Sequence, residues 1–472
     1  MPTVNTTCVQ ARYDEQLARL YYLVNYDPDS VLSYALSGVD LNDVGVIVAA
    51  DVNSLPDLQY GDPPIYNVDG MVYFVQSLGI IVISSNNTWL TLDGTVVRTD
   101  NIEYLSWAWG AGSAGRLGNN CTTNQSSPVS VVGGFTDWCQ VAPGAYHSTG
   151  ITQNGIAWTW GCNDVGQLGT NNTTNRSSPV SVVGGFTDWC QITGGWRASN
   201  AVRQNGTAWS WGCNDVGQLG DNTLVSKSSP VSVVGGFTDW CQVSAGFNHV
   251  IAVRQNGTAW AWGAAGNGAL GDNNNTNRSS PVSVVGGFTD WCQVSAGGFG
   301  GASAGFSVAV RQNGTAWAWG FNGTGQLGDN SGTNRSSPVS VVGGFTDWCQ
   351  VSASDFFNDA FSNGVRQNGT LWSWGSDTCG QLGDNSITNR SSPVSVVGGF
   401  TDWCQVTAGY KFALGVRTNS TLWAWGANGS GQLGDNTTVS KRSPVSVVGG
   451  FTDWCQVSAG FNTVLALRVK II

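Results

Sequence analysis

The chain has 472 residues, 41% of them apolar and only 11% charged, and no apolar run approaches the roughly 20 residues of a membrane span. The net charge of −10 lies entirely in residues 1–105, which hold 13 acidic residues and 3 Arg; the remainder is neutral and lacks the clustered Lys and Arg that nucleic-acid binding needs. Two His and no C-x-x-C pair argue against a zinc site, and residues 1–16 lack the basic and apolar regions of a secretory signal.

Residues 1–38 form a helical lead-in by their pattern. Leu17, Leu20 and Val24 recur at helical spacing within 14–25, and a second short helix is expected over 30–36. The stripe of Leu17, Leu20 and Val24 also offers a surface through which several chains could form a homo-oligomer, such as a trimer.

Residues 39–101 are expected to form a small acidic β module. Strands are predicted at 45–50, 71–76 and 80–84, followed by a hairpin that pairs 89–92 with 95–98.

The module resembles the short adaptor domains of bacteriophage tail and fibre proteins. The resemblance rests on Leu55-Pro56-Asp57, on 70–75 and on 87–94. It implies that residues 1–101 attach the chain to other virion proteins, whereas the alternative is a packing cap for the repeats that follow.

From Trp107 onward one block occurs seven times. Each copy carries Trp-x-Trp-Gly, a Gly-x-Leu-Gly turn, a Ser-Pro-Val-Ser strand and Phe-Thr-Asp-Trp-Cys-Gln, at spacings of 51, 51, 51, 57, 55 and 51 residues. A fixed period near 50 indicates a repeat architecture. The first Trp of each copy is Trp107, Trp158, Trp209, Trp260, Trp317, Trp372 or Trp423.

Each period predicts four antiparallel strands, which is one blade of a β-propeller. In one copy these are 230–234, 238–244, 250–255 and 258–262. The last two are joined by Asn256-Gly257, a dipeptide typical of type I′ hairpins. In the second strand, strict alternation places Trp240 and Gln242 on one face.

The ends of the repeat region predict a closed ring over 102–472. It opens with a lone fourth strand at 104–109 and closes with a third strand at 463–468, so one blade should take three strands from one end and one from the other. The fold class is therefore all-β: a seven-bladed β-propeller of four-stranded blades, preceded by a small α+β module.

These repeats resemble those of the regulator of chromosome condensation family. The order of Trp-x-Trp-Gly, Gly-Gln-Leu-Gly and Ser-Pro-x-x-Val carries the likeness, together with Gly-x-x-His at 144–147 and 246–249, although the other blades lack that His. The resemblance implies a seven-bladed propeller. Its members serve as exchange factors, protein-binding scaffolds and inhibitors, so it leaves function open.

Comparison of the seven copies with one another shows where the chain varies. Variation gathers between the predicted second and third strands, and in the turn after each Trp pair, such as 161–164. Since connections alternate ends along antiparallel strands, these two sets are expected at different ends or edges of the ring. Variable loops on a constant frame are typical of recognition surfaces.

The first variable set supplies the candidate ligand-binding residues. It is rich in aromatic and cationic side chains, which are common anchors in interfaces, but residues at these positions can also fill the centre of the ring. Both roles stay open. The candidates are Tyr146, His147, Trp196, Arg197, Phe247, His249, Phe299, Phe356, Phe357, Tyr410 and Lys411.

Catalytic chemistry is not expected, nor is a metal or another cofactor. His147 and His249 have no nucleophile or carboxylate at a repeating offset, so a structural role is favoured. Asp355 and Asp359 share one long loop and are the only candidate carboxylate pair. The Leu-Gly-Asp-Asn turns lack the spacing of a calcium loop and predict Asx turns.

We therefore expect a non-enzymatic virion structural protein of the phage tail or fibre type, whose loops bind a host-surface protein or glycan. The near-identity of the blades fits a fast-changing recognition element. The alternative is a cytoplasmic interaction scaffold or small-GTPase exchange factor of the chromosome-condensation type. A polysaccharide-cleaving tailspike using Asp355 and Asp359 is the third reading.

Overall fold

The computed structural model describes residues 47–49, 72–75, 80–85, 88–91, 96–99, 102–298, 305–354 and 359–471. The chain divides into two units, of which Tyr104–Val469 forms the larger. The predicted helices and the oligomer-forming stripe of Leu17, Leu20 and Val24 lie outside the described residues. None of the helices in the described part is long and apolar enough to cross a bilayer.

The strands predicted in the N-terminal module are confirmed to within about two residues. They are β1 (Ile47–Ala49), β2 (Val72–Val75), β3 (Ile80–Ser85), β4 (Thr88–Thr91) and β5 (Val96–Thr99). They form one sheet in chain order, in which β1 and β2 are parallel and the other pairs antiparallel. A function for this module stays a prediction.

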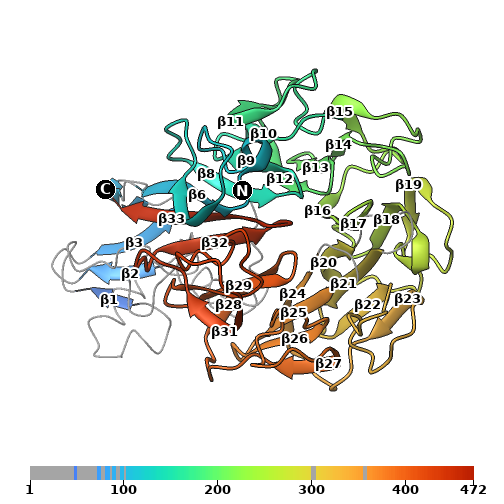
Figure 1. The fold of residues 1–472 in the computed structure, drawn as a ribbon. Helices are drawn as coiled ribbons and strands as arrows, with labels where there is room; N and C mark the ends of the chain where they lie inside the picture. Colours follow the sequence, from blue (N-terminus) through green and yellow to red (C-terminus); the bar gives the residue numbers. More distant parts are fainter. Residues whose placement is uncertain are drawn as a thin grey trace, which may run out of the picture. The chain divides into compact units, whose positions relative to one another are not determined.

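The larger unit is an all-β ring of seven four-stranded antiparallel sheets, which confirms the seven-bladed propeller (Figure 1). The first strands of the blades, which begin at the Trp of Trp-Cys-Gln, are β8 (Trp138–Pro143), β12 (Trp189–Gly194), β16 (Trp240–Ala245), β20 (Trp291–Gly298), β24 (Trp348–Ala353), β28 (Trp403–Ala408) and β32 (Trp454–Ala459). The second strands are β9 (His147–Thr152), β13 (Ala198–Arg203), β17 (His249–Arg254), β21 (Gly305–Arg311), β25 (Phe361–Arg366), β29 (Phe412–Arg417) and β33 (Thr463–Ile471).

The third strands carry the Trp pairs and the fourth strands the Ser-Pro segment. The third strands are β10 (Ala157–Gly161), β14 (Ala208–Gly212), β18 (Ala259–Gly263), β22 (Ala316–Gly320), β26 (Leu371–Gly375), β30 (Leu422–Gly426) and β6 (Ile102–Gly110). The fourth strands are β11 (Arg176–Ser181), β15 (Lys227–Ser232), β19 (Arg278–Ser283), β23 (Arg335–Ser340), β27 (Arg390–Ser395), β31 (Lys441–Ser446) and β7 (Gln125–Ser130). Two 3₁₀ turns, η3 (Ser113–Gly115) and η4 (Gly266–Gly268), lie in the long loops.

The predicted strand composition of the closing blade is wrong. Its order is β32-β33-β6-β7, so each end of the chain supplies two strands. The reason is that each Ser-Pro strand pairs with the Trp-pair strand before it, as Trp260 does with Ser283, and therefore completes the preceding blade. The Gly-Gly-Phe-Thr-Asp segment then crosses to the next blade.

A β-bulge changes the face pattern predicted for the first strands. Trp240 pairs with Arg254 and Gln242 pairs with Val253, which leaves Cys241 as the extra residue. Trp240 and Val243 are consequently buried on the same side, although they are three residues apart. All eleven described cysteines are free, and the thiol of Cys241 donates to the carbonyl of Val253 at 3.4 Å.

The hairpin between the second and third strands is not the predicted type I′ turn. Gly257 has a φ of 73°, but Asn256 does not have a positive φ. Arg254 N–H donates to Thr258 O and Gly257 N–H to Arg254 O, which makes a three-residue loop ending on a left-handed glycine. In the last hairpin Ser420 adopts that conformation, with a φ of 58°.

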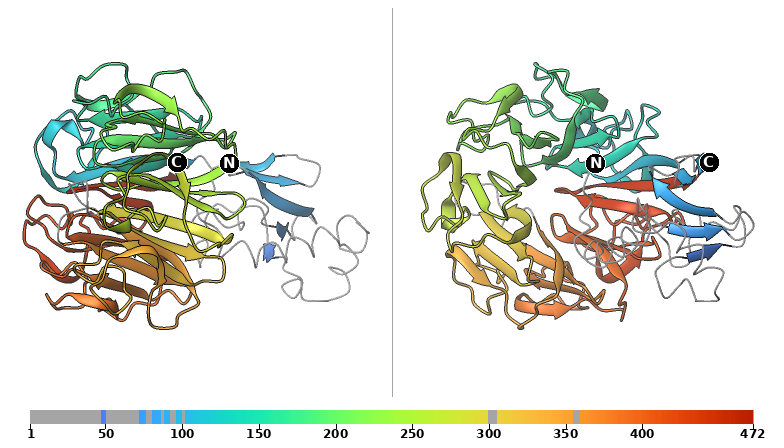
Figure 2. Two further views of the ribbon diagram at one scale, coloured as in Figure 1. Left: turned by 90° about the vertical axis from the view of Figure 1, so that its right-hand side faces the viewer. Right: turned by 180° about the vertical axis from the view of Figure 1, so that it is seen from behind.

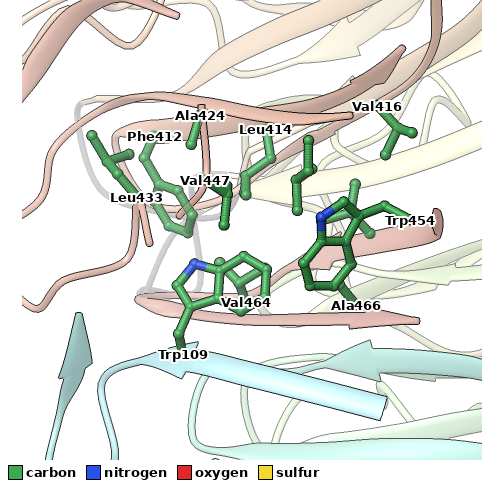
Figure 3. Close-up of a cluster of buried hydrophobic side chains, with 12 residues drawn as sticks. Trp109, Phe412, Leu414, Val416, Ala424, Leu433, Val447, Trp454, Val464 and Ala466 are labelled. Atoms are coloured by element: carbon green, nitrogen blue, oxygen red, sulfur yellow. The ribbon is translucent and has the colours of Figure 1, made fainter. Parts of the chain in front are cut away.

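The cores lie between adjacent blades. Figure 3 shows the core that joins β30 and β29 to the closing blade, where Trp109 and Trp454 face Phe412 and Leu414. The two indoles meet edge to face at 5.9 Å, and Trp109 Nε1 donates to the carbonyl of Gln432 at 3.0 Å. Trp109 therefore buries a large apolar surface and also satisfies its polar atom.

The first strands line the middle of the ring, where each contacts the first strands of both neighbours (Figures 1 and 2). Each carries a Gln whose side-chain oxygen accepts the backbone N–H of the next first strand at 2.7–3.1 Å. The circuit includes the step from Gln456 to Val141, so it closes the ring. These amides occupy strand edges that would otherwise be unpaired. We call this circuit the glutamine belt: Gln140, Gln191, Gln242, Gln293, Gln350, Gln405 and Gln456.

Candidate functional site

The two sets of variable loops lie on the same face of the ring, so their predicted separation is wrong. Two strands separate the loops of each blade, and each strand reverses the chain direction, which returns the second loop to the same side. The two sets are also hydrogen-bonded: Cys162 N–H donates to Tyr146 O at 3.0 Å, and Ala264 N–H to Asn248 O at 2.8 Å. We call this side the variable face and the opposite side, with the Asn-Gly hairpins, the constant face.

Glycines at the ends of the first strands bring neighbouring blades close together on the variable face. A Cβ on Gly144 would lie 2.4 Å from the carbonyl oxygen of Gly195, and one on Gly460 would lie 2.4 Å from that of Gly144. Any larger residue would therefore push the blades apart. The residue after each glycine is held close to its counterpart in the next blade.

The close approach produces two groups of aromatic contacts that cross blade boundaries. Trp196 stacks on Phe247 with centroids 4.2 Å apart, and Tyr410 stacks on Phe461 at 4.8 Å. Tyr146 lies 6.3 Å from Phe461. These five residues are called the aromatic collar. Phe461 was not among the predicted site residues, although it occupies the same place after a glycine as Trp196 and Tyr410.

The collar is partly buried, and its burial is compatible with either of the two roles left open by the sequence. Phe247 is 7% exposed, whereas Tyr146, Trp196, Tyr410 and Phe461 are partly exposed. In the two stacked pairs, the contact between the rings covers part of each aromatic surface. Three further predicted aromatics, Phe299, Phe356 and Phe357, lie outside the described residues.

Cationic side chains lie over three of the collar rings. The charged groups of Arg116, Arg197 and Lys411 lie 5.4, 5.2 and 5.2 Å from the centroids of Tyr146, Trp196 and Tyr410 respectively. Such contacts hold the rings in one orientation. Arg197 forms an ion pair with Asp164, which comes from the second variable set.

The candidate carboxylate Asp359 is committed to a structural role. It pairs with Lys411 Nζ at 2.9 Å and accepts the hydroxyl of Thr378 at 2.8 Å. Burial alone would lower the pKa of Lys411, but the hydrogen bond and charge of Asp359 outweigh it, and the pKa is raised. Its proposed partner Asp355 lies outside the described residues.

His147 and His249 lie beneath the variable face and link blades. His147 Nε2 lies 2.8 Å from Ser199 Oγ, and His249 Nε2 lies 3.0 Å from Ser307 Oγ. Both histidines are buried, and burial lowers the pKa of each to about 4. Each serine donates its own proton to a backbone carbonyl, so it accepts the imidazole N–H. Neither serine was predicted from the sequence, although they follow their histidines by 52 and 58 residues, about one repeat.

The Asp turns are Asx turns, as predicted. Asp221 Oδ1 accepts the backbone N–H of Thr223 at 3.0 Å, and Asp329 accepts that of Ser331 at 3.1 Å. The described part of the chain brings no group of three or more His, Cys, Asp or Glu together for a metal ion.

A family model described as "RCC1-like domain" matches residues 106–466. The chain belongs to this family. The match spans the propeller strands and ends short of both termini, so it gives no support to the adaptor-like reading of residues 1–101.

Individual proteins are also similar to this RCC1-like chain in sequence. The ultraviolet-B receptor UVR8 of Arabidopsis thaliana is 29% identical over 357 residues, which cover 71% of this chain and 76% of the receptor. The mitochondrial RCC1 domain-containing protein RUG3 of the same plant is 25% identical, over 72% of this chain and 81% of RUG3. Human E3 ubiquitin-protein ligase HERC2 is 28% identical, but the match covers only 5% of HERC2.

Solved structures share the fold. Yeast RCC1 (Prp20), in a complex with Kap60, matches with a TM-score of 0.68 at 19% identity, covering 79% of this chain and 90% of that one. Human WBSCR16 matches with a TM-score of 0.67 at 18% identity, covering 79% of this chain and 99% of that one.

The expected virion protein is therefore wrong. The relatives are cellular proteins of plants and humans, and the likeness runs through the ring itself. Two predictions depended on a virion protein and are not supported either: that residues 1–101 dock on other virion proteins, and that the loops bind a host-surface ligand.

Proposed function

We propose that this RCC1-like protein is a non-enzymatic interaction scaffold that binds a protein partner through its variable face. The main support for this proposal is that both variable loop sets lie on one face, around a half-buried aromatic collar. Aromatic and Arg side chains held rigid before binding lose little entropy in a complex. The site is therefore suited to anchoring a protein surface.

The constant face supports this assignment by contrast. Its hairpins keep the Asn-Gly dipeptide in five of the blades, and its Arg residues are already used in ion pairs with Asp. Because this surface is nearly the same in each blade, a partner could not distinguish one blade from the next. The loops of the variable face differ from blade to blade and can define a single docking orientation.

The names of relatives suggest the class of partner. One solved structure is described by its binding to Gsp1p and histones, and another contains Kap60, so protein partners are common to that protein. We extend only that class to the present chain, together with a location inside cells. Histone binding is not extended, because the ring of this chain is neutral overall.

The test uses the full chain and two matched variants. Trp196→Ala/Tyr410→Ala removes one ring from each stacked pair, and Gln255→Ala/Gln367→Ala alters two exposed residues of the constant face. Partners captured by the wild-type chain are purified, and their affinities are measured by calorimetry. We expect the collar variant to bind at least about 30-fold more weakly, since anchor residues contribute about 2 kcal/mol or more.

The control should bind as the wild type does, and all three chains should melt cooperatively. Loss of binding in the control with full affinity in the collar variant would overturn the assignment to the variable face. If the chain is an exchange factor, it should also accelerate nucleotide release from a small GTPase. Release that is unaffected by the collar variant would exclude the collar from that activity.

A further inference from the structure

Four blades hold their variable-face loops with a buried Asn that follows the Trp pair. In one of them Asn322 Oδ1 accepts the backbone N–H of Leu327 at 3.0 Å. Its Nδ2 donates to Asp329 Oδ1 at 2.9 Å and to the carbonyls of Ser331 and Thr333 at 3.2 and 3.1 Å. The side-chain amide thus donates hydrogen bonds to one carboxylate oxygen and two carbonyl oxygens, none of which can donate a hydrogen bond in return. The four residues are Asn163, Asn214, Asn322 and Asn428.

Asp377 occupies the same place in the blade of β24–β27. It is fully buried, and its Oδ1 accepts the backbone N–H of Leu382 at 3.0 Å, as in the Asn blades. Its own N–H donates to Asn389 Oδ1 at 2.9 Å, where Asn322 donates to Asn334 at 2.8 Å. The loop is therefore built on the same plan, with oxygen in place of the donating nitrogen.

That oxygen has no hydrogen-bond donor. Asp377 Oδ2 is buried without a donor, at the position where three of the four Asn amides donate to an Asp carboxylate and to backbone carbonyls. Asp384 is the counterpart of Asp329, and its buried carboxylate interacts with Asp377. Two buried carboxylates facing each other cannot both be ionised without a large cost.

The charges around Asp377 do not offset a second negative charge. Arg390 is bound to Asp384 Oδ2 at 3.0 Å, and Lys411 is bound to Asp359, which in turn accepts the hydroxyl of Thr378. Burial, and then the charge of Asp384, raise the pKa of Asp377 to about 7, against the lowering effect of Arg390. The neighbouring blade contributes Arg442, whose carbonyl accepts Asn385 N–H and whose side chain packs at Gly380. Cys379 is the remaining titratable group of the loop.

We propose that Asp377 carries a proton that it donates to Asp384, and that release of this proton opens the loop 376–389. The loop displays Ile387, which is 52% exposed, on the variable face. This pH-dependent opening does not depend on the proposed function. Only an effect of the opening on a bound partner would rest on the proposed function. One blade of the face would then respond to pH while the Asn blades do not.

The direction follows from the proton balance. The closed loop holds the proton up to about pH 7, whereas the opened loop, with an ordinary carboxyl pKa of 3.8, releases it much lower. The opened form is therefore favoured progressively as the pH rises from about 4 to 7, and the effect levels off above 7. Over that range the opening constant should rise up to about tenfold per pH unit.

Hydrogen exchange of the full chain tests this. Peptides covering 376–389 are compared with peptides covering 321–334, the loop of Asn322, so that the intrinsic pH dependence of exchange cancels. We expect the ratio of opening constants to rise between pH 5 and 7 in the wild type and to be flat in Asp377→Asn. Asn322→Asp should transfer the behaviour to 321–334, since Asp329 and Arg335 reproduce the surroundings.

Three results would overturn the switch. One is a ratio that does not change with pH in the wild type, and another is a change that persists in Asp377→Asn. The third is closure of the loop at pH 8 on adding CaCl₂, reversed by EDTA, which would make the oxygens a cation site instead. Because no partner is present, the outcome is independent of whether the chain binds a protein through this face.

Discussion

The two faces of the propeller are built from the same seven repeats, yet they hold the ring in different ways. On the constant face, Arg254 lies 4.1 Å from the ring of Phe237 and bonds Asp239 at 2.7 Å, and the same unit recurs in other blades. On the variable face, a backbone hydrogen bond such as Cys213 N–H to Arg197 O recurs between the two loop sets, and in four blades a buried Asn side chain also holds the second loop. Backbone bonds leave the side chains free to differ, so sequence change accumulates where it does not loosen the ring.

The largest effect expected from a single substitution concerns the frame beneath both faces. Trp262 is fully buried and its Nε1 donates to Gln218 O at 3.1 Å. Trp262→Ala should lower the free energy of unfolding by about 3–5 kcal/mol, because it leaves a cavity and an unpaired carbonyl. Urea unfolding followed by circular dichroism measures this. Trp196→Ala on the variable face is the matched control. An equal loss of unfolding free energy in that variant would show that the buried frame is no more important for stability than the variable face.

The buried histidines should make the ring sensitive to acid. The pKa of His147 and of His249 falls from 6.5 to about 4 on folding, so the unfolded chain binds more protons between these values. Stability is therefore complete above about pH 6.5 and is lost as the pH falls towards 4, by about 3 kcal/mol for each histidine.

The double variant His147→Gln/His249→Gln should remove most of this acid dependence, since a Gln amide can still reach the serine without gaining charge. Thermal unfolding at pH 4, 5 and 7 compares the two chains. An unchanged pH profile in the variant would show that the histidines are not the groups that titrate.

The glutamine belt should contribute less, because each of its members acts at one blade junction. Gln293 accepts Val351 N–H at 2.7 Å and donates to Val351 O at 2.8 Å. Gln293→Ala should cost about 1–3 kcal/mol by leaving both backbone groups unpaired. Denaturant unfolding tests this against the exposed Gln255→Ala of the constant face, for which no measurable change is expected.

The smallest effect is expected on the constant face itself. Arg254→Lys keeps the charge beside Asp239 but loses the flat stack on Phe237, at a cost of about 0.5–1 kcal/mol. The pair, whose side chains are 20% and 27% exposed, should weaken further in 1 M salt. A loss that exceeds that of Gln293→Ala would place the main blade links at the rim of the ring rather than at its centre.

Much of the fold could be predicted because its signals are local. Alternating apolar residues between turn signals located the strands of the N-terminal module at 71–76 and 80–84, and the recurring Trp pairs counted the blades. The candidate site, which stays a prediction, was only partly readable from the sequence. Trp196 and Tyr410 were found by their variation, but their stacking on Phe247 and Phe461 depends on glycine contacts between blades.

By itself, the sequence determined that there are seven repeated blades, since periodicity and turn chemistry act over a few residues. Tertiary structure alone decided that the Ser-Pro strand closes the preceding blade, that both variable loop sets share a face, and that His147 finds Ser199. It also left Asp377 without a donor for one oxygen. These features join residues roughly one repeat apart or in neighbouring loops, and their partners are set by how strands and blades pack.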